Sequence, residues 1–331
     1  MAVNRQELQR ILSELSVKIR VDEEDLKKSR RTMEGVTQTL LKGLQMQHGI
    51  VRNFQYTGSS YEGTKIIQAD EFDVMVLLNG NMEGGLQIET RTPGYATLQP
   101  KKPSAAIYSD FLDCDHRFLS PEKVRQRFTG MVQTQLNKLN FPVPVKLLAH
   151  GPAVMLRIQD KHHIVEVDLV PTFVVDDQFY VAKPYKSYAD NPERSIGGVS
   201  TSLFWRQFTS LDEKSMLSTI DRDQGCRRKC LKILKYMRTR DATLSCLTSF
   251  HFKNLVLHHA ADGDWRDANM AERFLDLLQS LCTCLDGGNL KHYFISPVNL
   301  LDGFGANVIA NPKGRVRRLT SSDQAIRQLL Q

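Results

Sequence analysis

The spacing of apolar residues changes twice along the chain, and this change limits the fold more than any other feature. Up to residue 44, apolar residues recur three and four apart, as in Leu8, Ile11, Leu12 and Leu15, which is the spacing of one helix face. From about residue 54 short apolar runs predict strands, and beyond residue 200 the helical spacing returns. The pattern predicts an α+β protein with two lobes: residues 1–200, with a long N-terminal spine helix, and a helical lobe at residues 201–331.

Local signals place several elements within this outline. Asp22 is a candidate N-cap, and residues 72–78 read as a strand that ends at the turn signal Asn79-Gly80. Two further strands, 154–158 and 163–170, suit a hairpin, and residues 121–139 read as a helix with Pro121 at its start. Residues 184–200 are expected to form a loop. Residues 303–318 lack a clear period, so no regular structure is expected there.

Composition excludes several classes of protein. With 331 residues, 41% hydrophobic and 24% charged, the chain is neither a disordered nor a disulfide-framework protein. No apolar run approaches the ~20 residues that span a bilayer, and the N-terminus lacks a secretory signal. We therefore expect a soluble, cytoplasmic protein without a membrane partner, whose six cysteines are reduced thiols.

Positive charge is concentrated in one segment. The whole chain has a formal net charge of +7, and residues 222–240 alone hold eight basic residues against one acid, Asp223. On a helix, Arg228, Lys232 and Lys235 would lie opposite the apolar stripe of this segment. Such a face binds phosphates with little sequence preference, although a solvated helix face explains the same pattern.

Acidic residues alternate with apolar ones in two predicted strands. Side chains two apart share a strand face, so Glu71 and Asp73 project together while Phe72 points into the core. Asp168, in another strand, is the candidate for a third carboxylate. Carboxylates this close repel one another unless a cation lies between them, and Mg²⁺ prefers such oxygen ligands. Three such carboxylates could hold the two metal ions that take part in phosphoryl transfer.

A glycine and serine turn precedes the first acidic strand. Gly58 allows close backbone approach, and the hydroxyls and amides of Ser59 and Ser60 can hold phosphate oxygens. Taken singly, a Gly-Ser-Ser turn is common and an acidic pair in a strand is usually solvated. Glu166 shares the face of Asp168 and is either a bystander or a substitute ligand.

These motifs resemble a known family in their order and spacing. Gly58-Ser59 followed by Glu71-Phe72-Asp73-Val74 resembles the signature of the DNA polymerase beta-like nucleotidyltransferase superfamily. The whole stretch 58–75 is similar to cyclic GMP-AMP synthase and the cGAS-like receptors within the Mab-21 group. A second block, residues 226–236 with 249–253, resembles the helical lobe of that family. The resemblance extends from about residue 56 to about residue 294.

The resemblance implies a bilobal nucleotidyltransferase core and assigns roles to residues. Glu71, Asp73 and Asp168 would be catalytic and bind metal, with Mg²⁺ as cofactor and Mn²⁺ as an alternative. Nucleotide contacts would come from Thr57, Gly58, Ser59, Ser60, Arg206, Glu213, Lys235, Ser249, Phe250 and Lys253. Phe250 stands where the synthase has a base-stacking tyrosine, which puts base selectivity in question. No zinc is expected, because residues 208–225 contain no Cys or His.

The resemblance also implies an activity. The expected function is an enzyme that, activated by nucleic acid, makes a cyclic dinucleotide of the cGAMP type from ATP and GTP in innate immune sensing. The expected activator is double-stranded RNA rather than DNA, docked on Lys27, Lys28, Arg31, Arg228 and Lys232, with a ligand-induced dimer as a further expectation. The alternatives are a template-independent nucleotidyltransferase that extends oligonucleotides, and a catalytically silent Mab-21-like binding protein.

Overall fold

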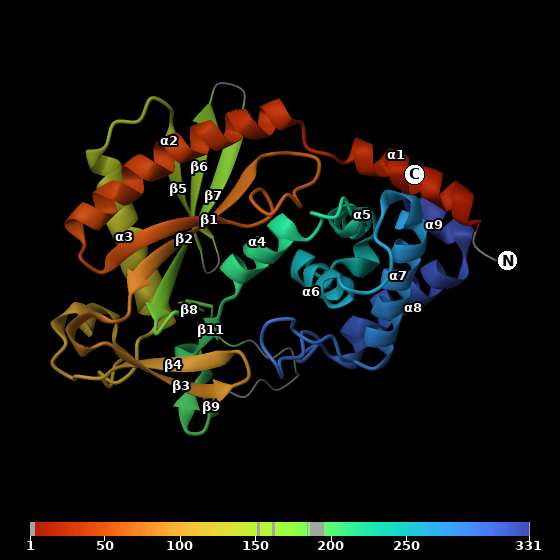
Figure 1. The fold of residues 1–331 in the computed structure, drawn as a ribbon. Coiled ribbons are helices and arrows are strands. Elements are labelled where there is room, and N and C mark those ends of the chain that lie inside the picture. The colour runs from red at the N-terminus through yellow and green to blue at the C-terminus, as the bar shows by residue number, and fades with distance from the viewer. Residues whose placement is uncertain (1–3, 151–152, 161–162, 184, 186–194, 331) are drawn as a thin grey trace.

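The computed structural model describes residues 4–150, 153–160, 163–183, 185 and 195–330, and these form two lobes (Figure 1). One lobe is built on a mixed sheet and the other is helical, so the predicted α+β architecture is confirmed. The helices are α1 (Arg5–Lys18), α2 (Glu23–Gln47), α3 (Pro121–Lys138), α4 (Ser210–Thr219), α5 (Arg227–Arg240), α6 (Ser249–His259), α7 (Met270–Asp286), α8 (Ala306–Ser321) and α9 (Asp323–Leu330).

The main sheet runs in the order β1-β2-β7-β8-β11-β4-β3, and β6 joins β7 with β5 beside it. Only β2 and β7 pair in parallel among the named pairs of this sheet; the others are antiparallel. The strands are β1 (Val51–Thr57), β2 (Glu71–Asn79), β3 (Leu86–Thr92), β4 (Tyr95–Pro100), β5 (Val145–His150), β6 (Ala153–Asp160), β7 (His163–Val175), β8 (Gln178–Val181) and β11 (Trp205–Gln207), with a separate hairpin of β9 (Ser195–Ile196) and β10 (Val199–Ser200).

The sheet has its own core beneath α2 and α3. Leu40 of α2 and Phe128 of α3 pack with Phe72, Val74 and Val76 of β2 in one buried cluster. β2 reads as a nearly continuous apolar run after its acidic start, because it is paired on both edges and covered by side chains. The sheet therefore holds the first residues of β2 at a fixed place.

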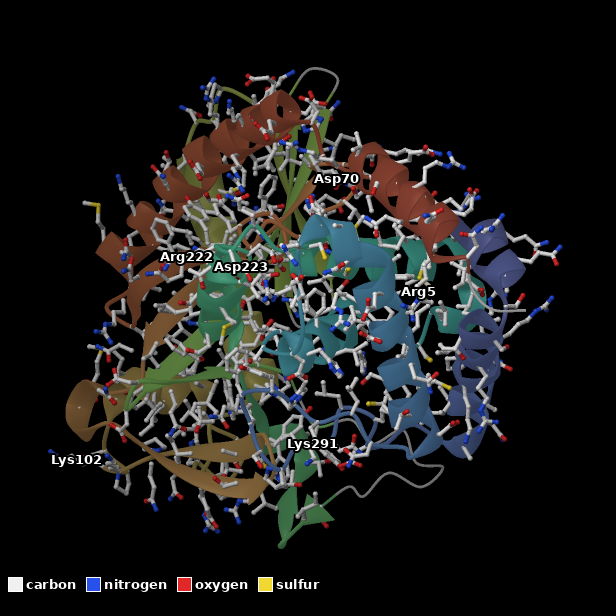
Figure 2. The ribbon with its side chains drawn as sticks, turned by 45° about the vertical axis from the view of Figure 1, so that its right-hand side comes forward. Arg5, Asp70, Lys102, Arg222, Asp223 and Lys291 are labelled. Atoms are coloured by element: carbon white, nitrogen blue, oxygen red, sulfur yellow. The ribbon has the colours of Figure 1, made fainter. Side chains whose placement is uncertain are left out.

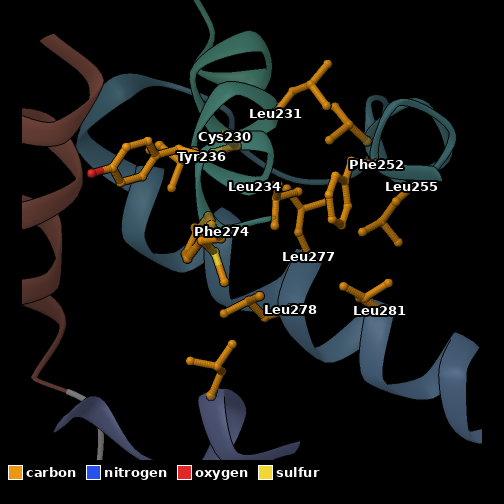
Figure 3. Close-up of a cluster of buried hydrophobic side chains, with 14 of the residues drawn as sticks. Cys230, Leu231, Leu234, Tyr236, Phe252, Leu255, Phe274, Leu277, Leu278 and Leu281 are labelled. Atoms are coloured by element: carbon orange, nitrogen blue, oxygen red, sulfur yellow. The ribbon is translucent and has the colours of Figure 1, made fainter. Parts of the chain in front are cut away.

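A second core fills the helical lobe. Figure 3 shows Leu234 of α5, Phe252 of α6 and Leu277 of α7 meeting between their helices. Cys230 is buried in the same cluster, and the six cysteines are free thiols, as expected. α5 is therefore fixed through its apolar face, which leaves its basic face directed elsewhere.

The N-terminal helices are shared between the lobes. The apolar stripe of α1 packs into the helical-lobe core through Leu8, Ile11, Leu12 and Leu15, although its sequence lies in the predicted segment 1–200. The apolar stripe of α2 packs instead against the sheet. Asp22 caps α2 as predicted, since its carboxylate accepts the backbone N–H groups of the next turn. The opening helices thus tie one lobe to the other.

Most local predictions agree with the structure, and one is wrong. The hairpin is β6 and β7, and the helix at 121–139 is α3 with Pro121 in its first turn. The expectation of no regular structure at 303–318 is wrong, because α8 covers it from Ala306. Pro312, Val316 and Leu319 form a buried stripe there, and Pro312 hides the pattern by its low helix propensity.

Of the predicted loop at 184–200, residues 184 and 186–194 lie outside the described residues, and Gly197-Gly198 forms the turn of the β9 and β10 hairpin. Among the described residues, no helix is both long enough and apolar enough to cross a bilayer.

The position of α1 predicts its importance for stability. Leu12 is fully buried in the helical-lobe core, so Leu12→Ala should lower the free energy of unfolding by about 2–5 kcal/mol. Val17 on the same helix is 73% exposed, so Val17→Ala should change it by less than about 0.5 kcal/mol. Urea denaturation measures both, and equal small effects would show that α1 is not part of this core.

Candidate active site

Two of the three predicted carboxylates lie side by side. β2 and β7 pair in parallel with Asp73 directly opposite Asp168, and Thr57 of β1 lies opposite Asp73 on its other side. Directly opposed residues in a sheet project to the same face. Phe72 is fully buried on the other face. The pairing therefore brings Thr57, Asp73 and Asp168 into one row across three strands.

The turn after β1 closes against this row. Gly58 has a φ of +76°, and a Cβ at this position would overlap the carboxylate of Asp73. The carbonyl of Gly58 accepts the N–H groups of Tyr61 and Glu62, each at 3.0 Å, so the chain turns sharply here. Glycine is required both for the backbone angle and for the room taken by Asp73.

The two serines of the turn differ in their surroundings. Ser60 is 2% exposed, and its hydroxyl donates to the carbonyl of Glu71 at 3.0 Å, so it ties the turn to the start of β2. The carbonyl of Ser59 accepts the N–H groups of Thr64 and Lys65, and its side chain is half-buried. In this structure Ser59 is the serine whose hydroxyl remains for a ligand.

Charge repulsion is concentrated on Asp73. Burial raises the pKa of Asp73 to about 7, and the carboxylates of Glu71, Asp168 and Glu62 add to this rise, while Lys253 opposes it. A group in this state gains from any nearby cation. Asp73 therefore has a strong electrostatic demand for positive charge.

Glu71 lies on the same strand face as Asp73 and acts on it electrostatically, but its carboxylate is bound by a lysine. It begins β2 opposite Glu166, is largely exposed, and accepts a hydrogen bond from Lys65 at 3.1 Å; Lys65 also lies 3.3 Å from Asp70. Within the described part of the chain, no three Asp, Glu, His or Cys side chains are arranged to hold a metal ion. The structure thus brings Asp73 and Asp168 together and leaves Glu71 paired with a lysine.

Two predicted nucleotide contacts bind each other. Lys253 of α6 donates to Glu213 of α4 at 2.7 Å and to Glu62 of the turn at 2.8 Å. Burial alone would lower the pKa of Lys253, but Glu213 and Glu62 outweigh it and raise this pKa well above its usual value. Thr209 donates to the same Glu213 at 2.8 Å. Without Lys253, the buried carboxylates of Glu62 and Glu213 would have no positive partner, which is costly. The cluster therefore holds the helical lobe against the turn.

The basic face of α5 points at the same turn. Lys235 donates to the carbonyl of Thr64 at 2.6 Å, and its burial lowers its pKa to about 8. The Arg228 guanidinium lies over Gly63 and is paired with Asp221 at 3.2 Å. The expected open cationic face is therefore partly turned inward, toward the first lobe.

The predicted nucleic-acid contacts divide into two groups. Lys27, Lys28 and Arg31 of α2 are exposed, although Lys27 is paired with Glu24 at 2.8 Å. Lys232 of α5 is only partly exposed, and its burial lowers its pKa, with Arg228 and then Arg20 as further causes. Figure 2 shows charged side chains projecting from both lobes, including Arg222 and Asp223 just before α5.

The predicted base-contacting residues come together from two elements. The guanidinium of Arg206 in β11 lies 5.9 Å from the ring centre of Phe250 in α6 and 5.8 Å from that of Phe208. Ser249 begins α6 beside Phe250. The Arg206 guanidinium therefore lies over both aromatic rings, in cation–π contact with them.

Sequence reasoning did not assign roles to several residues of this region. Glu62 and Lys65 pair with Lys253 and Glu71, and Lys214 donates to the carbonyl of Tyr56 at 2.7 Å. The one signal for Glu62 and Lys65 is closeness to the Gly-Ser turn, and Lys65 lies only six residues from its partner Glu71. The partners of Glu62 and Lys214 lie 191 and 158 residues away in sequence, so no local pattern shows those pairings.

The raised pKa of Asp73 predicts a dependence of stability on pH. A carboxyl whose pKa rises from ~3.9 unfolded to about 7 folded destabilises the fold as it ionises, so stability falls as pH rises through this range. Asp73→Asn cannot ionise. Its Tm should therefore exceed that of the parent by an amount that grows from pH 4 to about pH 7 and then levels off.

Thermal unfolding of both proteins in chelator, at half-unit pH steps, measures this difference. Glu166→Gln is the matched control, because Glu166 lies on the same sheet face but is paired with Arg157 at 2.6 Å. A Tm difference that does not change with pH would contradict the raised pKa of Asp73.

Two protein-family models match the chain. Residues 60–187 match the model of the Mab-21 protein nucleotidyltransferase domain, and residues 226–317 match that of the Mab-21 protein HhH/H2TH-like domain. The first match holds Glu71, Asp73 and Asp168, and the second holds Lys235, Phe250 and Lys253.

Two relatives extend the similarity to the whole chain. Cyclic GMP-AMP synthase-like receptor 3 of Stylophora pistillata is 30% identical over 351 aligned positions that cover 100% of both chains. Protein mab-21-like of Drosophila pseudoobscura pseudoobscura is 22% identical over 323 positions, covering 86% of this chain and 85% of its own. With both domains matched and a relative aligned from end to end, the chain belongs to the Mab-21 family and resembles its cyclic GMP-AMP synthase-like receptors over its full length.

Proposed function

We propose that this chain is a nucleic-acid-activated nucleotidyltransferase that makes a cyclic dinucleotide from ATP and GTP in innate immune sensing. The observation that carries the proposal is the row of Asp73 and Asp168 closed off by Gly58. Arg206 and Phe250 support it, because they bring a cation and an aromatic ring together from the two lobes. The similarity to a cyclic GMP-AMP synthase-like receptor supports the type of product.

The proposed cofactor is Mg²⁺, with Mn²⁺ as an alternative. The donors that would hold it are the carboxylates of Asp73, Asp168 and Glu71, and the raised pKa of Asp73 fits a site made for a cation. For Glu71 to bind the metal, its hydrogen bond with Lys65 would have to break. When bound, the metal would supply charge stabilisation for the phosphates and the leaving group.

The residues of the chain have separate roles in the proposed reaction. A ribose hydroxyl attacks the α-phosphate of a nucleotide, pyrophosphate leaves, and Asp168 accepts the hydroxyl proton. The amides of the turn at Gly58 and Ser59 hold phosphate oxygens, with Lys235 as the nearby cation. A second attack of the same kind closes the ring.

The proposed activator is double-stranded RNA. The exposed cations of α2, Lys27, Lys28 and Arg31, supply the accessible part of its binding surface. Arg228 and Lys232 would contribute where α5 meets the turn, so a polymer bound there would act on the segment that closes over Asp73. We also propose that two copies of this chain form a dimer when duplex RNA binds.

Product analysis tests the activity. Purified protein is incubated with ATP, GTP, Mg²⁺ and a panel of RNA and DNA duplexes, and the product mass is measured. We expect a cyclic dinucleotide with duplex RNA, a loss of roughly 10³-fold or more in Asp73→Asn, and little change in Glu166→Gln. A linear ladder would indicate oligonucleotide extension. No product from any duplex, with duplexes bound equally by Asp73→Asn, would indicate a silent binding protein.

Charge reversal on α2 tests the activator surface. The triple change Lys27→Glu, Lys28→Glu, Arg31→Glu should weaken duplex binding and reduce the salt dependence of the affinity, because it removes phosphate contacts. Lys102→Glu removes an exposed lysine near β3 and β4 (Figure 2) and should leave both unchanged. Fluorescence anisotropy at several salt concentrations measures the duplex affinity and its salt dependence for each protein. Equal binding by the triple variant and the parent would place the duplex elsewhere.

A further inference from the structure

Lys65 lies between two acidic side chains at the start of β2. Its Nζ is 3.1 Å from the carboxylate of Glu71 and 3.3 Å from that of Asp70 (Figure 2). The side chain of Lys65 is 12% exposed, whereas those of Glu71 and Asp70 are 60% and 46% exposed. A buried ammonium group needs a charged or polar partner, and here it has two that water can also reach.

The fold of the turn sets Lys65 against Glu71. The backbone N–H groups of Thr64 and Lys65 both donate to the carbonyl of Ser59 at 3.0 Å, and Lys235 of α5 donates to the carbonyl of Thr64 at 2.6 Å. At the other end, the Ser60 hydroxyl donates to the carbonyl of Glu71 at 3.0 Å. Both members of the ion pair are therefore fixed through their backbones.

The pair explains why the acidic side chains of this face are not gathered. Glu71 and Asp73 share one face of β2, yet among the residues that the structure describes no three acidic, histidine or cysteine side chains are arranged to hold a metal ion. Arg157 does not neutralise Glu71, because it is bound to the neighbouring Glu166 at 2.6 Å. Lys65 thus supplies the positive charge that Glu71 has in this structure.

We propose that Lys65 is a built-in counter-ion that competes with the divalent cation for Glu71 and so limits the affinity of the site for metal. The inference rests on the proposed function, because it concerns the regulation of the cation site of that enzyme. Lys65 is a positioning residue in this account, since it acts through Glu71.

Asp70 makes the exchange of partners inexpensive. When Glu71 leaves Lys65, the ammonium group keeps the carboxylate of Asp70, so no buried charge is left without a partner. Asp70 directly precedes β2, and its carbonyl accepts the N–H group of Glu166 at 2.7 Å, which holds its backbone against β7.

Substitutions of Lys65 separate its charge from the rest of the side chain. Lys65→Met removes the ammonium group and keeps an unbranched side chain, and because Glu71 and Asp70 are exposed, its loss leaves no buried carboxylate unpaired. Lys65→Arg keeps the positive charge and the ability to donate. Lys27→Met is the matched control, since Lys27 pairs with Glu24 at 2.8 Å on α2.

Binding of Mn²⁺, measured by loss of the free-ion electron paramagnetic resonance signal without nucleotide or duplex, gives the readout. Loss of any nearby positive charge strengthens cation binding, so the pairing is measured as the difference between two backgrounds. We expect Lys65→Met to bind Mn²⁺ roughly three- to tenfold more tightly than the parent, but to change the affinity of Glu71→Gln by less than about twofold. Lys65→Arg and Lys27→Met should bind as the parent does.

Asp70→Asn tests the exchange partner. Without the charge of Asp70, Lys65 keeps Glu71 as its charged partner, so Mn²⁺ binding should weaken by roughly two- to fivefold. The same substitution in Glu71→Gln should have a smaller effect, because the competition is already absent there.

The outcomes distinguish this inference from the proposed function. Equal effects of Lys65→Met in both backgrounds, or no gain in Mn²⁺ affinity in the parent, would overturn the role of Lys65 and leave the enzyme proposal standing. No Mn²⁺ binding by the parent or by Lys65→Met, with nucleotide present or absent, would overturn the cation site of the proposed function itself. Thermal unfolding in chelator shows that each variant compared is folded.

Discussion

The parallel pairing of β2 with β7 is the constraint on which the site depends. It sets Asp73 opposite Asp168, inside a sheet whose other described strand pairs are antiparallel. The cost is visible at Asp73, whose pKa rises because burial and neighbouring carboxylates disfavour its charge. The cation that we propose at this site would relieve this repulsion. The turn at Gly58 then limits what can approach the pair.

The helical lobe supplies the opposite charge to the same turn. Lys253 binds Glu62, the Arg228 guanidinium lies over Gly63, and Lys235 binds the carbonyl of Thr64, so three cations contact three consecutive residues. These contacts run from the core of one lobe to the turn that closes on Asp73 in the other. A shift of α5 or α6 would therefore change the environment of the carboxylates, and this is the route by which we propose that the activating polymer acts on the site.

The sequence predicts those parts of the fold and site that depend on local pattern. The alternation of Glu71, Phe72 and Asp73 predicts one strand with its acids on one face, because strand side chains alternate. The register with Asp168 and the pairing of Glu62 with Lys253 depend on contacts between distant segments, which no local period encodes. The position of α1 in the second lobe has the same cause, since an apolar stripe does not say which core it enters. Pro312 concealed α8.

Binding of Mn²⁺, followed by loss of the free-ion electron paramagnetic resonance signal, tests most directly whether the facing carboxylates form a cation site. The account predicts that the parent chain binds Mn²⁺ and that Mg²⁺ competes for the same site. Asp73→Asn and Asp168→Asn should each weaken binding by about tenfold or more, whereas Glu166→Gln should bind as the parent does. Equal binding by all four proteins, or none by the parent with nucleotide present, would contradict the account.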